Sequence, residues 1–171
     1  GYMRAQQSVR TSISAVLTGD SAAAVSRRDL EVWYREMFSP HVDAGLLKQT
    51  QVLGYRRQPV YIRGSRHVPL PHDAVADAMD ELFRQLDDEP TACVRAVLGH
   101  FVFTWIHPFS DGNGRLGRFL MNVQLASDGY PWTVVRMEQR TRYMAALEAA
   151  SVDGDIRPFA ELIRGEMRAD T

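Results

Sequence analysis

The sequence has little cysteine, almost no net charge and no long apolar run. Among its 171 residues Cys93 is the one cysteine, which excludes a disulfide framework. A formal net charge of −1 gives no reason to expect a nucleic-acid partner, although a local basic pocket for a small anion is compatible with it. The apolar stretch 94–106 is too short to span a bilayer, and residues 1–12 lack the apolar core of a signal peptide. We therefore expect a soluble, cytoplasmic protein with no membrane partner.

Apolar periodicity predicts an all-α fold in a single domain over residues 1–171. Apolar residues make up 45% of the chain, enough at this length for one compact core. In most segments they recur on one helical face, and Ser26 is a suitable N-cap for the first of these. One segment is apolar nearly all round, as expected of a central helix. The predicted helices cover residues 26–38, 73–86, 92–106, 113–128, 136–151 and 156–169.

One segment differs from this pattern. Residues 51–66 are rich in β-branched and aromatic residues and are punctuated by glycine and proline. This composition predicts a short β-hairpin that forms a flap on the helical bundle.

The stretch "HPFSDGNGRLGR", residues 107–118, concentrates polar chemistry between two apolar segments. Pro108 ends the preceding helix, and a new helix is expected to begin near Asn113. Free N–H groups of Gly112, Asn113 and Gly114 would then form an anion site at a helix N-terminus. Two arginines follow within one turn and can grip phosphates bidentately; these are Arg115 and Arg118.

Two further residues extend this chemistry. Asp111 would repel a bare phosphate but suits one that arrives with Mg²⁺. His107 has an ordinary pKa of about 6.5, so its neutral imidazole can deprotonate a hydroxyl at cellular pH. A base, a metal ligand, an amide site and two arginines are the parts needed to transfer a phosphorus-containing group to a hydroxyl.

Simpler interpretations exist for each residue. Asp111 could cap a turn, paired arginines often form a solvated face, and a histidine after an apolar helix is often a core residue. A zinc hydrolase is a second alternative, because His100 and His107 lie seven residues apart. The sequence has no HExxH motif, however, and its other histidines are scattered, so His100 is expected in the core.

The motif resembles the Fic family signature, His-x-Phe-x-Asp/Glu-Gly-Asn-Gly-x-x-x-Arg, at every defining position. The resemblance implies a small helical fold with a β-hairpin flap. It also implies transfer of AMP from ATP to a Ser, Thr or Tyr hydroxyl of a target protein, with release of pyrophosphate. In that scheme His107 is the general base, Phe109 anchors the loop and Asp111 holds Mg²⁺. The phosphates are held by Gly112, Asn113, Gly114, Arg115 and Arg118.

The resemblance assigns weaker roles elsewhere. The flap residues Val60, Tyr61 and Ile62 would hold a target segment by strand-like main-chain pairing. Tyr143 would pack near the adenine. Glycine at position 114 favours nucleotidyl transfer over phosphate transfer. Phosphocholine transfer and a non-catalytic nucleotide-binding or adaptor module remain alternatives, and a homodimer or a regulatory partner is compatible with the sequence.

The N-terminal residues 5–20 resemble an inhibitory helix of the same family. Its frame, Ser/Thr-x-x-x-Glu-Gly/Asn, fits Ser14 to Gly19 except that Thr18 stands in place of the glutamate. A threonine cannot pair with Arg118 as a carboxylate does, so the resemblance implies an uninhibited enzyme. It also weighs against removal of AMP, which depends on that glutamate. The alternative is an ordinary packing helix whose fit to the frame is accidental.

Overall fold

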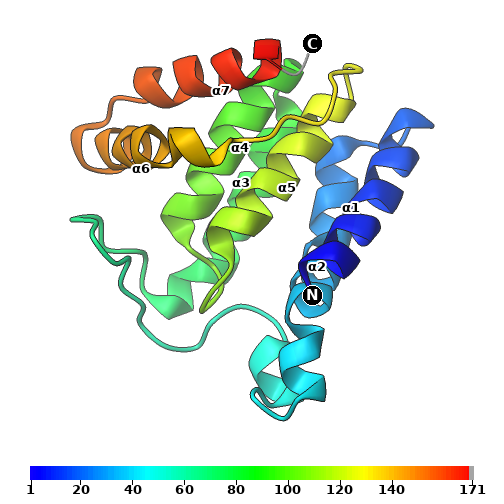
Figure 1. Ribbon diagram of the computed structural model, residues 1–171, viewed down its shortest axis with the longest axis vertical. Helices are drawn as coiled ribbons and strands as arrows, with labels where there is room; N and C mark the ends of the chain where they lie inside the picture. Colours follow the sequence, from blue (N-terminus) through cyan, green and yellow to red (C-terminus); the bar gives the residue numbers. More distant parts are fainter. Residues whose placement is uncertain (170–171) are drawn as a thin grey trace.

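The computed structural model describes residues 1–169 and shows an all-α fold in that part of the chain. The first five helices form the body of the bundle, and a pair of C-terminal helices lies across one side of it (Figure 1). The α-helices are α1 Tyr2–Leu17, α2 Ala22–Asp43, α3 Val75–Asp88, α4 Ala92–Ile106, α5 Asn113–Ala126, α6 Arg140–Glu148 and α7 Arg157–Ala169. Short turns of 3₁₀-helix cover Gln49–Val52, His72–Ala74 and Met137–Gln139, and a π-helical turn covers Ala149–Asp153.

Helices α1 and α2 form an antiparallel hairpin. The first residue of α1, Tyr2, is preceded by Gly1, which lies against Met37 near the end of α2. Helix α2 begins earlier than predicted, because Ser21 is its N-cap and accepts a hydrogen bond from Ala24 N–H at 3.2 Å. Ser26 is instead buried inside the helix, where its hydroxyl accepts a hydrogen bond from Gln124 of α5.

Helices α4 and α5 form the centre of the bundle and carry the motif between them. Helix α4 packs more extensively on α5 than on any other element. A Cβ at Gly117 would lie 3.1 Å from the Thr104 methyl group and 3.3 Å from His100 Nε2, so glycine permits this close packing. The buried apolar residues of α1, α2, α3 and α5 complete this core.

A second apolar cluster joins α4 and α5 to the C-terminal helices. It contains Met121 and Leu125 of α5, Tyr143 of α6 and Phe159 of α7. The cluster fixes α6 beside the start of α5, and so places one more wall next to the motif (Figure 1).

The predicted β-hairpin at residues 51–66 is absent from the structure, which contains no strand within residues 1–169. After the turn at Gln49–Val52, the chain runs as an irregular extended loop with one tight turn, where Ser65 N–H donates to the Ile62 carbonyl at 3.1 Å. A hairpin needs repeated cross-strand main-chain hydrogen bonds, and side-chain tethers hold this segment instead. Its β-type composition leaves the backbone of residues 60–62 extended without an internal strand partner.

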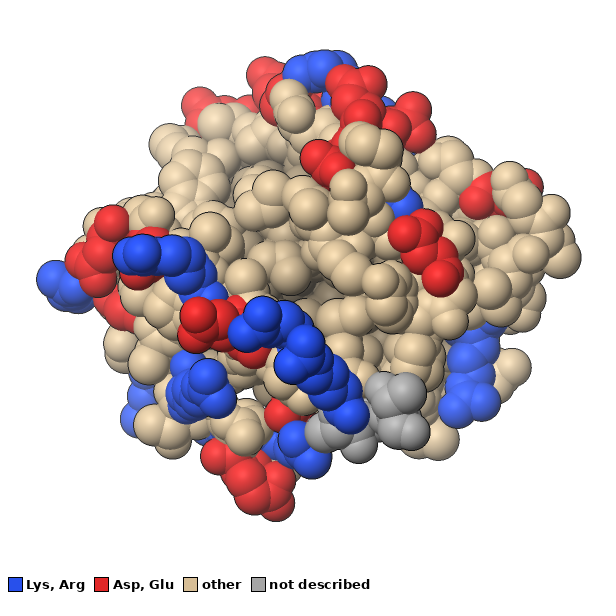
Figure 2. Space-filling model, turned by 90° about the horizontal axis from the view of Figure 1, so that it is seen from above, with Lys and Arg blue, Asp and Glu red and all other residues tan. Residues whose placement is uncertain are grey.

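The helices of the described residues include none that is long and apolar enough to cross a membrane. Seen from above in Figure 2, basic side chains gather mostly toward the lower left of the molecule, and other residues fill most of the middle of this face. Acidic side chains lie between the basic ones there.

Candidate functional site

His107 occupies the C-cap of α4 in a left-handed conformation. Its φ of 55° is the one positive φ of a non-glycine residue within residues 1–169. This conformation turns the chain away from the helix, and Pro108 prevents the helix from continuing. The His107 Nδ1 atom lies 3.2 Å from the Thr104 carbonyl oxygen. Because a carbonyl only accepts, Nδ1 carries the proton, and Nε2 is the nitrogen with a free lone pair.

The surroundings of His107 favour its neutral form. Burial lowers the pKa of His107 below its ordinary value, and the positive charge of Arg56 acts in the same direction. The hydrogen bond to Thr104 and the charge of Asp111 act against this shift without cancelling it. A neutral imidazole with a free Nε2 is the form required of a general base.

Phe109 anchors the loop between α4 and α5 in the hydrophobic core. Its ring is fully buried, stacks on Tyr34 at 4.1 Å between centroids, and contacts the rings of Tyr55 and Phe103 at 5.6 and 6.4 Å. Burial of an aromatic ring of this size contributes roughly 2–3 kcal/mol of stability. The short loop therefore has one defined path.

Asn113 closes the same loop with its side chain. Its Oδ1 accepts a hydrogen bond from Phe109 N–H at 2.9 Å, and its Nδ2 donates to the Phe109 carbonyl at 2.8 Å. Asn113 is 2% exposed, so both bonds are shielded from water. Of the Asn113 groups, the main-chain N–H therefore remains available to a ligand, and the side-chain amide serves the loop.

The N-terminus of α5 presents unpaired main-chain donors. Gly112 has a φ of 83° and donates its own N–H to the Asp111 carboxylate at 2.6 Å. The next two N–H groups, of Asn113 and Gly114, have no acceptor among residues 1–169. A helix N-terminus with free N–H groups attracts an anion, as the sequence predicts here.

Asp111 and Arg115 form an exposed pair beside these donors. Their side chains lie 3.3 Å apart and are 74% and 38% exposed, and the Arg115 guanidinium stands 5.4 Å from the centre of the Phe38 ring. A pair this exposed is weak enough to separate when a ligand arrives. No group of three His, Cys, Asp or Glu residues within residues 1–169 could hold a metal ion, so Asp111 could supply only part of a coordination shell.

Arg118 lies one turn farther along α5 against Tyr143. Its guanidinium is 5.8 Å from the centre of the Tyr143 ring, and no carboxylate of the described residues forms an ion pair with it. Tyr143 is 6% exposed and its hydroxyl lies 3.0 Å from His100 Nε2. His100 is fully buried, as expected. Arg118 is therefore packed on the Tyr143 ring, and its positive charge is not neutralised by an acidic partner among the described residues.

Two cavities meet at these residues. One, of approximately 320 Å³, is lined by the residues of the α5 N-terminus, by Arg115 and Arg118, and by Arg136 and Arg140. The other, of approximately 360 Å³, lies between the extended loop and α6 and is mostly apolar. Both are lined by His107, Gly114, Tyr143 and Met144. A larger apolar cavity of approximately 690 Å³ lies between α4 and α7, and none of the motif residues lines it.

The Fic/DOC family matches residues 24–125, which include the whole motif. The chain belongs to the Fic/DOC family. Protein adenylyltransferase Fic of Drosophila ananassae is 40% identical over 113 residues, covering 64% of this chain and 22% of that protein. Protein adenylyltransferase fic-1 of Caenorhabditis elegans is 32% identical over 126 residues, covering 71% and 23%. The chain thus matches about a fifth of the length of these relatives.

Solved structures agree with this assignment. A Fic family protein from Desulfovibrio desulfuricans G20 is 28% identical with a TM-score of 0.71, covering 99% of this chain and 54% of that one. Fic-1 of C. elegans (residues 134–508) has a TM-score of 0.76 at 24% identity over 99% of this chain and 48% of that one, a likeness of fold. The all-α architecture is therefore a Fic-like fold.

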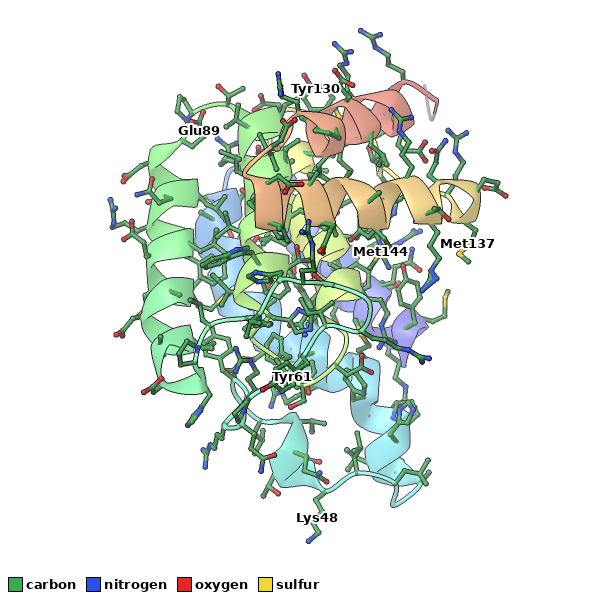
Figure 3. All side chains as sticks on the ribbon, turned by 90° about the vertical axis from the view of Figure 1, so that its left-hand side faces the viewer. Lys48, Tyr61, Glu89, Tyr130, Met137 and Met144 are labelled. Carbon is green, nitrogen blue, oxygen red and sulfur yellow. The ribbon has the colours of Figure 1, made fainter. Side chains whose placement is uncertain are left out.

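The extended loop of this Fic domain is tethered to α6 through Glu148. The Glu148 carboxylate accepts hydrogen bonds from the Ser65 hydroxyl and from Arg66 N–H, the latter at 2.8 Å. The Ser65 hydrogen bond is the largest of the contacts that lower the pKa of Glu148. Ile62 lines the apolar cavity, whereas Tyr61 is 82% exposed. Figure 3 shows Tyr61 on this loop and Met144 on the neighbouring α6.

Arg56 is a supporting residue that the sequence analysis missed. Its side chain is 5% exposed and donates to the main-chain carbonyls of His107 at 2.8 Å and Leu70 at 2.5 Å. Its N–H also donates to the Pro108 carbonyl at 2.9 Å. Arg56 thus joins both ends of the extended loop to the Fic motif. Arg56 and Arg57 are adjacent in a loop, and no periodicity or spacing distinguishes Arg56 or would have revealed this role.

Thr18 lies far from Arg118, against the prediction for residues 5–20. Tyr2, at the start of α1, contacts Phe119 of α5 with ring centroids 5.4 Å apart, so this end of α1 is level with Arg118. An α-helix rises about 1.5 Å per residue, which places Thr18 about 24 Å farther along the axis. There Thr18 is the C-cap of α1, and its hydroxyl donates to the carbonyls of Ser14 and Ala15.

The structure therefore does not support an ion pair between an acidic residue at position 18 and Arg118. The frame at residues 14–19 is fulfilled by an ordinary helix end, and Figure 1 shows that end of α1 opposite the motif loop. The physical reason is the direction of the α1–α2 hairpin, which the local sequence frame does not specify.

Proposed function

We propose that this protein is a Mg²⁺-dependent adenylyltransferase that transfers AMP from ATP to a Ser, Thr or Tyr hydroxyl of a protein target. The observation that carries the proposal is the position of His107. Its deprotonated Nε2 stands where a basic cavity at a helix N-terminus meets an apolar cavity. Homology to protein adenylyltransferases over the matched region supports the same reaction.

The two cavities suit the two halves of a nucleotide. The 320 Å³ cavity has the Asn113 and Gly114 N–H groups and the cations of Arg115 and Arg118, and would hold the phosphates. The 360 Å³ cavity has an apolar wall from Ile62, Met144 and Leu147, and would hold the adenine.

The Asp111 carboxylate fits a magnesium ion that arrives with the nucleotide. Mg²⁺ is commonly bound through one or two carboxylates together with substrate phosphates and water, so one exposed acid is sufficient. When bound, the ion would neutralise charge on the phosphates. Binding would require Asp111 to leave Arg115, which is freed to contact a phosphate.

His107 would act on the hydroxyl of the target. Nε2 takes the hydroxyl proton as the oxygen forms a bond to the α-phosphorus, and the bond from that phosphorus to the pyrophosphate oxygen breaks. The electron pair of the broken bond leaves with pyrophosphate. Arg118 and the N–H groups of α5 would stabilise the negative charge on the phosphate oxygens.

The extended loop would hold the target segment beside this centre. Val60, Tyr61 and Ile62 have main-chain N–H groups without acceptors within residues 1–169, so they can pair with an extended peptide. Recognition through the main chain places few demands on the sequence of the target.

Intact-mass spectrometry after incubation with Mg²⁺ and ATP tests the proposal, because self-modification needs no knowledge of the target. We expect an added AMP on the parent protein and none on His107→Ala, since loss of a positioned base lowers rates by about 10²–10⁴. His107→Asn is the matched control, because asparagine tolerates the left-handed backbone and also lacks the base. If the parent protein gained phosphate instead of AMP, the assignment as an adenylyltransferase would be wrong. If the His107 variants gained as much AMP as the parent protein, the assignment of His107 as the base would be wrong. Binding of ATP without any transfer would favour the adaptor alternative.

A further inference from the structure

His100 and Tyr143 form a buried polar pair behind the site. His100 on α4 is fully buried, and its Nε2 lies 3.0 Å from the Tyr143 hydroxyl. Its other nitrogen, Nδ1, is buried and has no hydrogen-bond partner among residues 1–169. Burial lowers the pKa of His100 to about 3, so the imidazole is neutral and carries a single proton.

The unpartnered Nδ1 indicates which nitrogen carries that proton. If Nδ1 held it, the only interaction open to the buried N–H among the described residues would be with the backbone of His100 itself, at a geometry that does not make a hydrogen bond, which is unfavourable. If Nε2 holds it, the Nε2–H donates to the Tyr143 oxygen, and Nδ1 keeps an unpaired lone pair, which occurs more readily. The second tautomer is therefore favoured, and it makes the Tyr143 oxygen an acceptor.

This tautomer leaves the Tyr143 O–H available to a ligand. Burial raises the pKa of Tyr143, so the hydroxyl keeps its proton at neutral pH, although the charge of Arg118 and a hydrogen bond from its side chain to the Tyr143 oxygen oppose the shift. The hydroxyl oxygen lies 4.0 Å from the point where a Cβ on Gly114 would stand, and Arg118 Nη1 lies 3.8 Å from the same point. The O–H is thus beside the free Gly114 N–H, at the junction of the two cavities.

We propose that the Tyr143 hydroxyl donates a hydrogen bond to a phosphate oxygen of the bound nucleotide, with His100 as the positioning residue that fixes its direction. This inference rests on the proposed function and refines it, because it moves Tyr143 from the adenine to the phosphates. Tyr143, Arg118 and the N–H groups of Asn113 and Gly114 together form one set of donors.

The tautomer is tested directly by long-range ¹H–¹⁵N correlation spectra of the ¹⁵N-histidine-labelled protein. We expect His100 to show the pattern of a neutral ring protonated at Nε2 across neutral pH. A ring protonated at Nδ1, or a charged imidazolium, would overturn the inference, since either changes what the Tyr143 oxygen can do.

The contact with phosphate is tested by calorimetric titration with Mg²⁺-ATP, Mg²⁺-pyrophosphate and adenosine. Tyr143→Phe keeps the ring under Arg118 and removes the hydroxyl, together with its hydrogen bonds to His100 and Arg118. A hydrogen bond to a charged group is worth about 1.5–3 kcal/mol, so affinity for both phosphate ligands should fall about tenfold or more. Adenosine affinity should stay unchanged. Equal phosphate affinity, or a loss confined to adenosine, would overturn the inference.

A pair of His100 variants completes the experiment. His100→Gln keeps an N–H donor at the ε position and should retain most of the phosphate affinity, whereas the shorter His100→Asn should lose as much as Tyr143→Phe. If the two variants bound the phosphate ligands with equal affinity, a hydrogen-bond donor at position 100 would not orient the Tyr143 hydroxyl. Failure of the parent protein to bind Mg²⁺-ATP would overturn the proposed function, whereas normal parental binding with an unaffected Tyr143→Phe would overturn this inference alone.

Discussion

The loop at residues 107–112 and the extended segment at residues 57–66 face the same cleft but are held in different ways. The loop is fixed by buried contacts, with the Phe109 ring below it and the Asn113 side chain across it. The extended segment is mostly exposed and is tied to α6 at the Glu148 carboxylate. Arg56 joins the two regions.

The difference separates two requirements of the proposed reaction. A base and a phosphate site must keep their geometry, and buried hydrogen bonds around a packed ring provide that. A segment that pairs with varied targets must have free main-chain donors, and an exposed loop with few tethers provides those. Variants that affect one region but not the other can therefore test this division.

The largest effect is expected from Asn113→Ala. It removes both hydrogen bonds that close the loop and leaves the buried N–H and carbonyl of Phe109 unpaired. Each buried unpaired group costs about 1–3 kcal/mol, so we expect a loss of roughly 3 kcal/mol in the free energy of unfolding, measured by urea denaturation. Asn113→Asp keeps the acceptor for Phe109 N–H and should lose less. Equal stability of the parent and Asn113→Ala would show that the loop is held elsewhere.

Arg56→Ala should affect both regions. It removes the donors that reach the carbonyls of His107, Gln58 and Leu70, and these carbonyls then depend on water. We expect a loss of about 2 kcal/mol in unfolding free energy, together with faster amide hydrogen exchange in both segments. Arg56→Lys retains one donor group and should recover only part of the loss. Faster exchange in one segment alone would contradict the joining role.

The pH dependence of transfer should reflect the burial of His107. Because burial lowers the pKa of His107, the imidazole stays neutral to a lower pH than an exposed histidine. The acid limb of kcat/KM for AMP transfer should therefore fall below the ordinary value of about 6.5, with activity lost as the pH drops through the lowered pKa. An acid limb above that value would show that His107 is not held as the structure indicates.

The smallest effect is expected from Glu148→Gln. This change weakens the tether of the extended segment but leaves the loop untouched. We expect an unchanged unfolding midpoint and unchanged kcat, with a KM for the protein target a few-fold higher. Steady-state kinetics with a protein that the enzyme modifies measures both constants, and Glu161→Gln, at an exposed position of α7, is the control. A fall in kcat without a change in KM would show that the tether supports the chemistry instead.

The central helices and the motif could be predicted from local sequence, because their signals are local. The all-round apolar character of residues 92–106 indicates a buried helix, and the glycines of residues 112–114 indicate a turn into a new one. Features that depend on tertiary partners were missed. Serine is a residue type that favours N-caps, but the Ser26 hydroxyl instead accepts a hydrogen bond from Gln124 inside the bundle.

The errors at the flap and at Thr18 have the same cause. The residues of segment 51–66 have high β propensity, yet a strand needs a neighbour to pair with. The tethers of this segment instead join Arg56 to His107 and Arg66 to Glu148, partners that lie far apart in the sequence. Thr18 fits a local frame, but its distance from Arg118 depends on which way the α1–α2 hairpin runs.

The shared wall of the two cavities has a consequence for the range of donors that this fold could accept. Because, among residues 1–169, the basic and apolar halves share only His107, Gly114, Tyr143 and Met144, the outer lining of the apolar half could vary without disturbing the phosphate contacts. A change at Leu147 would then alter which nucleobase is accepted while the transfer step stays the same. If the proposed reaction holds, donor choice and reaction chemistry are separable traits on which selection can act independently.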